Sequence, residues 1–232
     1  MDILFSTELQ LLHENRLANL NKQQLLPEDI IAVVDELSSR EVVNKTVIGH
    51  SFSGQAINCL TLGFGPKTIV MWTQMHGDES TATAAALDIV HLLSASRVTH
   101  LNADWQRLLT IHIIPMLNPD GAQTGTRENA QGIDINRDAM ALQTPEGRTL
   151  EAFVTKTQPD FAFNLHDQHD YYRCGADGQS STLAFLAPAF NSEKTVDLAR
   201  QKAMALIAEL QFQAKPFLPD NIARYDDEYS AR

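Results

Sequence analysis

The most informative part of the sequence is Thr68-Ile69-Val70-Met71-Trp72-Thr73-Gln74-Met75-His76-Gly77-Asp78-Glu79-Ser80. Its first six residues are apolar or β-favouring and follow Gly65-Pro66, which predicts a buried strand. The next residues, Thr81 to Leu93, are rich in Ala and Leu at helical spacing and predict a packed helix. His76 and Glu79 therefore lie where a strand passes into a helix. In open α/β sheets this edge is where ligands bind, so the stretch predicts an α/β fold and the position of its site.

Three side chains in this pattern predict a metal centre. An imidazole and a carboxylate on one turn, as in His76 and Glu79, can converge on a single metal ion, and a mixed N/O set suits zinc. Taken alone, this pair is more typical of an ordinary surface turn than of a metal site. A second strand, Asp160 to Leu165, leads directly to His166. Two imidazoles and one carboxylate form the ligand set of a catalytic zinc that keeps one position open, so His76, Glu79 and His166 are the predicted ligands.

The rest of the chain predicts alternating strands and helices around this stretch. We expect helices over 7–20, 28–38, 145–156 and 192–210, and strands over 47–50, 55–62, 108–117 and 183–186, with a turn at 118–121. The long polar loop 122–137 has no periodicity, and such loops are more often functional than not. The prediction is one α/β domain over 1–232, with a mostly parallel (mixed), twisted central sheet, helices on both faces and a helical segment 1–45 packed on it.

Composition narrows the class of protein. The formal net charge is −11 and no block of Lys and Arg occurs, which argues against nucleic acid or an anionic membrane as a partner. Cys59 and Cys174 are too few for a disulfide framework and are expected to be reduced and structural. The N-terminus lacks a basic region followed by an apolar core, and no apolar run approaches about 18 residues. These features predict a soluble cytoplasmic protein, with its oligomeric state left open.

Further motifs follow the first one in a characteristic order. They are Asn118-Pro119-Asp120-Gly121, the segment from Arg127 to Asp138 that reads Arg-Glu-Asn-Ala-Gln-Gly-Ile-Asp-Ile-Asn-Arg-Asp, and Asn164-Leu165-His166-Asp167. From about Gly49 to His166 the chain resembles the zinc metallocarboxypeptidase family, within the carboxypeptidase A-like superfamily and its bacterial or cytosolic-type branch. The middle segment is similar to that family's Arg-x-Asn-x-x-Gly-Val-Asp-Leu-Asn-Arg. The resemblance implies a carboxypeptidase-like (phosphorylase/hydrolase-like) fold that binds one Zn²⁺ ion.

The resemblance also implies roles for four residues of the loop 122–137. Arg127 would stabilise the tetrahedral oxyanion as a fixed cation. Asn136 and Arg137 would hold the free C-terminal carboxylate of a substrate, a task that suits the guanidinium fork. Asp134 would fix the tautomer and orientation of His76. The implied activity is a zinc-dependent carboxypeptidase that uses metal-activated water.

The match stops before the family's catalytic Glu, which lies on a later strand. Glu228 stands in a polar, loop-like setting and is not assigned this role. Either another carboxylate substitutes, or the C-terminal part is incomplete, and the second account is favoured. Asp78, Asp167 and His169 lie beside the ligands, where a supporting or solvated role is favoured over a second metal.

Other functions and other metals stay open. A related deacylase of the succinylglutamate desuccinylase and aspartoacylase type would act on an N-acyl amino acid, although the complete Asn118 to Gly121 turn favours a peptidase. A third hypothesis is a protein that binds metal and peptide but has weakened turnover. Another divalent transition metal could occupy the site during preparation.

Overall fold

The computed structural model describes residues 14, 16–20, 24–95, 104–167, 173–174, 179–218 and 222–224. Their contacts divide the chain into two compact units, Met1–Asp167 and Gln168–Arg232, which we describe separately. All seven residues predicted to act in the site belong to the first unit. The boundaries of one domain over 1–232, with its segment 1–45, stay a prediction.

The first unit is built on a five-stranded mixed sheet with the order β1-β2-β4-β3-β5. β3 pairs in parallel with β4 and β5, whereas β2 pairs antiparallel with β1 and β4. The strands are β1 (Val43–His50), β2 (Ala56–Gly63), β3 (Lys67–Thr73), β4 (Leu109–Ile114) and β5 (Phe161–Leu165). The predicted mixed sheet and the hairpin formed by its first two strands are confirmed.

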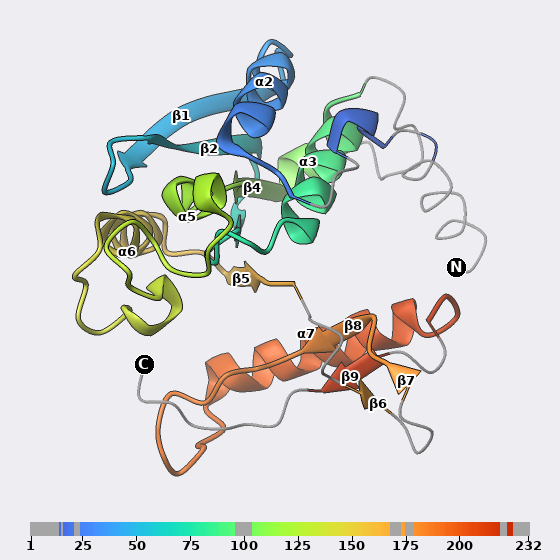
Figure 1. The fold of residues 1–232 in the computed structure, drawn as a ribbon. Coiled ribbons are helices and arrows are strands. Elements are labelled where there is room, and N and C mark those ends of the chain that lie inside the picture. The colour runs from blue at the N-terminus through green and yellow to red at the C-terminus, as the bar shows by residue number, and fades with distance from the viewer. Residues whose placement is uncertain are drawn as a thin grey trace. The chain divides into compact units, whose positions relative to one another are not determined.

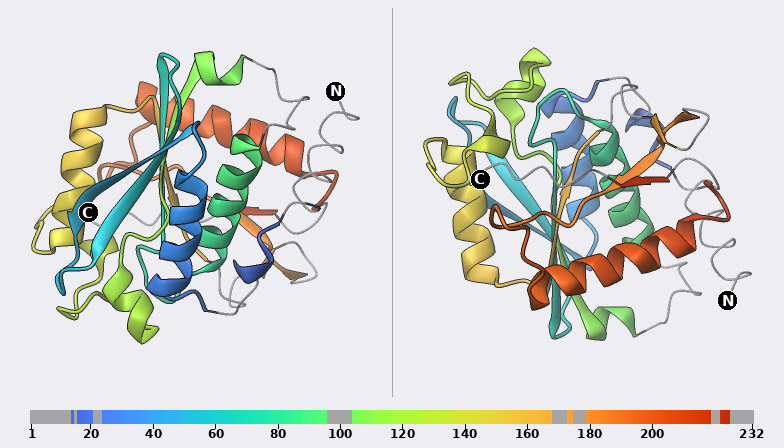
Figure 2. Two further views of the ribbon diagram at one scale, coloured as in Figure 1. Left: turned by 90° about the horizontal axis from the view of Figure 1, so that it is seen from above. Right: turned by 90° about the horizontal axis from the view of Figure 1, so that it is seen from below.

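Helices cover both faces of this sheet, as predicted. α2 (Pro27–Ser38) and α3 (Thr81–Ser94) lie on one face, and α6 (Pro145–Thr157) lies on the other (Figures 1 and 2). The chain passes from β3 to its neighbour β4 through α3, and then from β4 back across β3 to β5 through α6. The two connections therefore run across the sheet in opposite directions. Because such parallel crossovers are right-handed, the two helices fall on opposite faces.

The strands alternate their apolar side chains between two cores. In β2, Leu60 and Leu62 pack with α2 and α3, while Ile57 and Cys59 face the α6 side, where Phe153 packs. This is the alternation that a strand with two buried faces requires. β3, at the centre of the parallel strands, is thus held from both sides, and its carboxyl end is a rigid support for the loop that follows.

Several details of the first unit differ from the predictions, and β1 begins at Val43 and not at the predicted Val47. Residues 118–121 do not form an isolated turn but begin the short helix α5 (Pro119–Thr124), because the Asn118 side chain accepts from Gly121 N and Pro119 suits the first helical position. β4 ends at Ile114, short of the predicted Leu117, since Pro115 has no N–H to continue the ladder. Most of the predicted helix 7–20 lies outside the described residues, and its described end is the 3₁₀ turn η1 (Ala18–Leu20). The other short elements are α4 (Trp105–Leu108) and the 3₁₀ turn η2 (Ile135–Arg137).

Among its described residues, the second unit has the long helix α7 (Leu198–Ala214) and four short strands. β6 (Arg173–Cys174) pairs antiparallel with β7 (Gln179–Ser180), and β8 (Leu183–Phe185) pairs in parallel with β9 (Ile222–Arg224). The predicted start of the helix at Ser192 was wrong, because Asp197 caps the helix by accepting from Arg200 N at 2.8 Å. Within the described parts of both units, no helix combines the length and apolar character needed to cross a bilayer.

Candidate metal centre

The loop between β3 and α3 places two of the predicted ligands. His76 and Glu79 are buried, with 2% and 4% of their surface exposed. The loop begins at Gln74, which adopts a positive φ of 48° and whose side chain donates to Gly77 O at 2.9 Å. A Cβ atom at Gly77 would collide with the backbone of Gly121 in α5, so only glycine fits there. The loop is therefore fixed by its own side chains and by close backbone packing.

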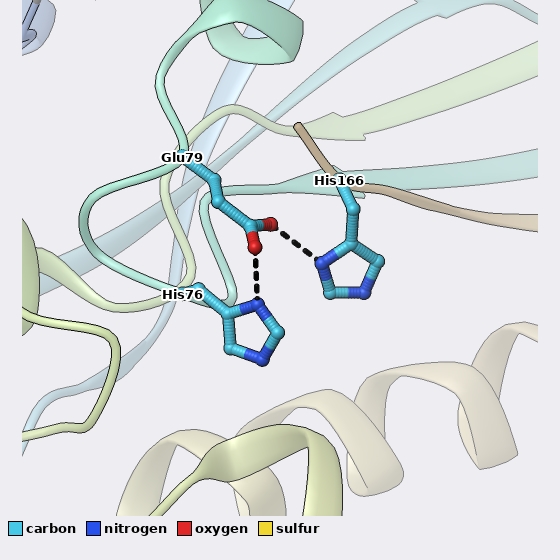
Figure 3. Close-up of side chains that lie close together, drawn as sticks. All are labelled: His76, Glu79 and His166. Atoms are coloured by element: carbon cyan, nitrogen blue, oxygen red, sulfur yellow. Dashed lines mark hydrogen bonds and ion pairs between the residues drawn. The ribbon is translucent and has the colours of Figure 1, made fainter. Parts of the chain in front are cut away.

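His166, at the end of β5, completes a convergent group (Figure 3). His76 Nδ1 lies 2.7 Å from Glu79 Oε1, and His166 Nδ1 lies 2.6 Å from Glu79 Oε2. One ligand atom from each of the three residues lies within 4.8 Å of the others. The His166 side chain is 28% exposed, so the group is open on the side of this imidazole. The structure thus brings together the three residues predicted to bind the metal.

The protonation pattern of this group suits a divalent transition metal. Asp134 Oδ1 lies 3.2 Å from His76 Nε2, an acceptor that would keep the ring proton on Nε2 when a metal ion takes the place of the Nδ1 proton. Burial by itself raises the pKa of Glu79, but hydrogen bonds from His166 and His76 outweigh burial and lower the pKa to about 2. Two imidazole nitrogens and an ionised carboxylate are a donor set that fits zinc.

The loop 122–137 brings three more of the predicted residues to this centre. Arg127 Nε and Nη2 each lie 3.0 Å from Asp134 Oδ2, and Nη1 lies 3.8 Å from Glu79 Oε1. Burial raises the pKa of Asp134, but the charges of His76 and Arg127 lower it below its ordinary value overall. Asn136 Nδ2 lies 3.4 Å from His166 Nε2. Arg127, Asp134 and Asn136 therefore border the candidate metal ligands.

Arg137 is placed differently from the other predicted residues. Its side chain is exposed, and Nη1 donates to the Asn136 carbonyl oxygen at 3.1 Å. Within the described part of the chain, Arg137 forms no ion pair with a carboxylate. Its guanidinium is therefore available to a ligand that approaches from solvent.

The structure adds an interaction that the sequence did not predict, at Asp167. Its N–H donates to Glu79 Oε2 at 3.2 Å, and its carboxylate accepts from Thr81 N and Ala82 N at the start of α3. Asp78, which was grouped with it, is exposed, and His169 lies outside the described residues. The adjacency of Asp167 to a ligand was the available signal, but its partners are 85 to 88 residues away in the sequence.

Two buried carboxylates also hold the surroundings of the centre together. Asp120 accepts from Ser51 Oγ, Ser53 N and Gln55 Nε2, and Glu146 accepts from Phe52 N and Asn129 Nδ2, all at 2.8 to 2.9 Å. Asn129 Oδ1 in turn accepts from Gln131 N and Ile133 N, directly before Asp134. Glu146 would be expected at the solvated N-terminus of a helix, so its full burial could not be predicted from the sequence.

Parts of this chain are similar to known proteins. Residues 30–142 match the family model described as zinc carboxypeptidase. An uncharacterised protein of Zymomonas mobilis is 32% identical over 149 residues, covering 60% of this chain and 36% of that protein. Murein peptide amidase A of Escherichia coli is 33% identical over 75 residues, covering 32% of this chain and 26% of that enzyme.

Solved structures show the same fold at lower identity. A metallo-carboxypeptidase from Burkholderia cenocepacia has a TM-score of 0.70 at 19% identity, covering 89% of this chain and 54% of that one. Carboxypeptidase A from Helicoverpa armigera has a TM-score of 0.65 at 17% identity, covering 94% of this chain and 64% of that one. This chain thus spans less than two thirds of the length of each of these relatives, and its fold is carboxypeptidase-like. Residues 30–142 of this chain are thus similar to the zinc carboxypeptidase family.

Proposed function

We propose that the chain carries the metal centre of a zinc-dependent carboxypeptidase, which removes C-terminal residues from peptides. The observation that carries this proposal is the convergence of His76 Nδ1 and His166 Nδ1 on the two oxygens of Glu79. His76, Glu79 and His166 would hold the zinc ion. When bound, zinc would supply Lewis-acid polarisation of the scissile carbonyl and activation of water.

The residues around the centre suit the recognition of a peptide terminus. Arg127 is anchored on one side by Asp134 and is 40% exposed, so it presents a fixed positive charge beside Glu79. Such a cation would stabilise the negative charge that develops on the carbonyl oxygen. The exposed guanidinium of Arg137, next to Asn136, would pair with the substrate's terminal carboxylate. Both groups favour a substrate that ends in a free carboxylate.

Proton transfer needs a further group. Two more carboxylates contact the centre within the described part of the first unit, and both are engaged: Asp134 by Arg127 and by Asn136 N, Asp167 by the N-terminus of α3. A general base would have to be a different carboxylate. Because loss of a general base costs about 100 to 10,000-fold in rate, the turnover of this chain measures whether it carries one.

A second candidate is suggested by the relative named murein peptide amidase A, which is 33% identical over 75 residues. It would use the same metal ligands to cleave an amide bond in a murein peptide. This candidate differs from the first in its substrate and shares its requirement for metal.

A substrate panel separates these activities. The zinc-loaded protein and its His166→Ala variant are incubated with short peptides, the same peptides as C-terminal amides, murein peptides and N-acyl amino acids, and products are identified by mass spectrometry. The proposal predicts release of C-terminal residues from the free-carboxylate peptides by the unaltered protein alone. Preferential cleavage of N-acyl amino acids would overturn it in favour of a deacylase, and binding of zinc without any cleavage would favour a binding protein.

A further inference from the structure

Asp167 joins the two segments that carry the candidate metal ligands. From the end of β5, its N–H donates to Glu79 Oε2 at 3.2 Å. Its carboxylate accepts from Thr81 N at 3.0 Å and from Ala82 N at 3.2 Å. A single residue next to one ligand thus contacts both the carboxylate of another ligand and the helix that starts beside it.

The helix α3 depends on this contact for its N-terminal cap. The first N–H groups of a helix have no partner within the helix. Ser80 occupies the N-cap position of α3, but its side chain makes no capping hydrogen bond. Asp167 supplies the missing acceptor from 86 residues further along the chain, and its negative charge also suits the positive end of the helix dipole.

This cap fixes the distance between the ligands. Glu79 lies two residues before Thr81, and the Thr81 N–H donates a hydrogen bond to Asp167. His166 lies directly before Asp167. The same Oε2 atom of Glu79 faces both His166 Nδ1, at 2.6 Å, and Asp167 N, at 3.2 Å. Any separation of the end of β5 from the start of α3 would therefore move His166 away from Glu79.

We propose that Asp167 is a positioning residue of the metal centre, which caps α3 from the end of β5 and thereby holds Glu79 and His166 ready to share one zinc ion. Both of its carboxylate oxygens accept from backbone N–H groups, so the side chain would act through the helix. Because the ligands are preassembled, less ordering is needed when zinc binds. This inference rests on the proposed metal centre.

The test compares three variants with the unaltered protein. Asp167→Ala removes both acceptors, and Asp167→Asn keeps one acceptor oxygen but removes the charge. Asp197→Ala is the matched control, since it deletes the N-cap carboxylate of α7, which contacts Arg200 N. Zinc affinity is measured by competition with a chromophoric chelator, geometry by the visible spectrum of the Co²⁺ form, and stability by thermal melting without metal.

We expect Asp167→Ala to weaken zinc binding about 10 to 100-fold and to change the Co²⁺ spectrum, with a smaller loss for Asp167→Asn. Asp197→Ala should lower the melting temperature and leave zinc affinity unchanged. If Asp167→Ala fails to fold, Asp167→Asn decides, and zinc affinity equal to that of the unaltered protein would overturn the inference. If the unaltered protein itself binds no zinc, the proposed function fails together with this inference. If the unaltered protein binds zinc and both Asp167 variants bind it equally tightly, the inference is refuted and the proposed function is not.

Discussion

Removal of the Asp134 carboxylate should weaken metal binding while leaving the fold intact. Asp134 Oδ1 lies 3.2 Å from His76 Nε2 and accepts from Asn136 N at 2.8 Å, and Oδ2 lies 3.0 Å from Arg127 Nε. In Asp134→Ala the His76 ring loses the acceptor that keeps its proton on Nε2. The imidazole can then turn or adopt the other tautomer, which would place a proton on the atom that faces the metal.

The size of the effect follows from this single contact. Loss of a hydrogen-bond partner behind a ligating histidine costs about 10 to 100-fold in metal affinity, or roughly 1.4 to 2.7 kcal/mol of binding free energy. Asp134→Asn keeps an oxygen for His76 and should stay near the lower value. The ion pair with Arg127 is 40% exposed on the arginine side, so its loss should lower the free energy of unfolding by only about 0 to 1 kcal/mol.

Zinc affinity of the two Asp134 variants is measured by competition with a chromophoric chelator, and unfolding by urea titration of the metal-free protein. The control is Asp35→Ala, which removes a carboxylate from a surface ion pair with Lys45. We expect weaker zinc binding in both Asp134 variants and unchanged zinc binding in the control. An Asp134→Ala variant that binds zinc as tightly as the unaltered protein would refute it.

Three further predictions concern the buried groups. Glu146→Ala should lower the free energy of unfolding, measured by urea titration, by about 2 to 4 kcal/mol, because Phe52 N and the Asn129 amide lose their buried acceptor. In the control, Glu151→Ala at an exposed position of the same helix should change the free energy of unfolding by less than about 0.5 kcal/mol. Equal losses in the two variants would contradict this. Burial raises the pKa values of Asp120 and Asp138, but hydrogen bonds outweigh burial and lower both pKa values below the ordinary value of 3.8. The stability that these carboxylates contribute is therefore complete above pH 3.8 and is lost as the pH falls through their pKa values in the folded protein. An unchanged urea midpoint from about pH 7 to about pH 3 in the metal-free protein would rule this out. Burial raises the pKa of the Cys59 thiol to about 12. Peptide mass spectrometry should therefore find Cys59 alkylated at about pH 8 only after the protein is denatured. Rapid labelling of Cys59 in the native protein would count against its buried position.

The sequence predicted the elements whose patterns are local. The strand before His76, the helix after Ser80 and the hairpin of β1 and β2 follow from periodicity and turn residues, and all three are present. α5 was missed although Asn118, Pro119 and Gly125 carry the signals of a capped short helix, because the four-residue turn motif was the stronger pattern. The start of α7 was misplaced because the polar residues before Asp197 are compatible with a helix and with a loop.

The parts of the site in which a ligand follows a strand could be predicted from the sequence. Contacts between segments that are distant in the sequence could not. His76, Glu79 and His166 stand at strand ends, so a parallel sheet brings them to one edge. Asp167 contacts residues of α3 that are 85 to 88 positions away, and such pairings leave no local pattern. The burial of Glu146 likewise depends on partners from two other loops.

In the proposed function, His76, Glu79 and His166 form one zinc site. Its most direct test is elemental analysis of bound metal in the unaltered protein and in His76→Ala and His166→Ala, with peptide hydrolysis assayed on the same samples. We expect about one divalent metal per chain in the unaltered protein and loss of that metal in both variants. Metal retained at the same stoichiometry in both variants would contradict it.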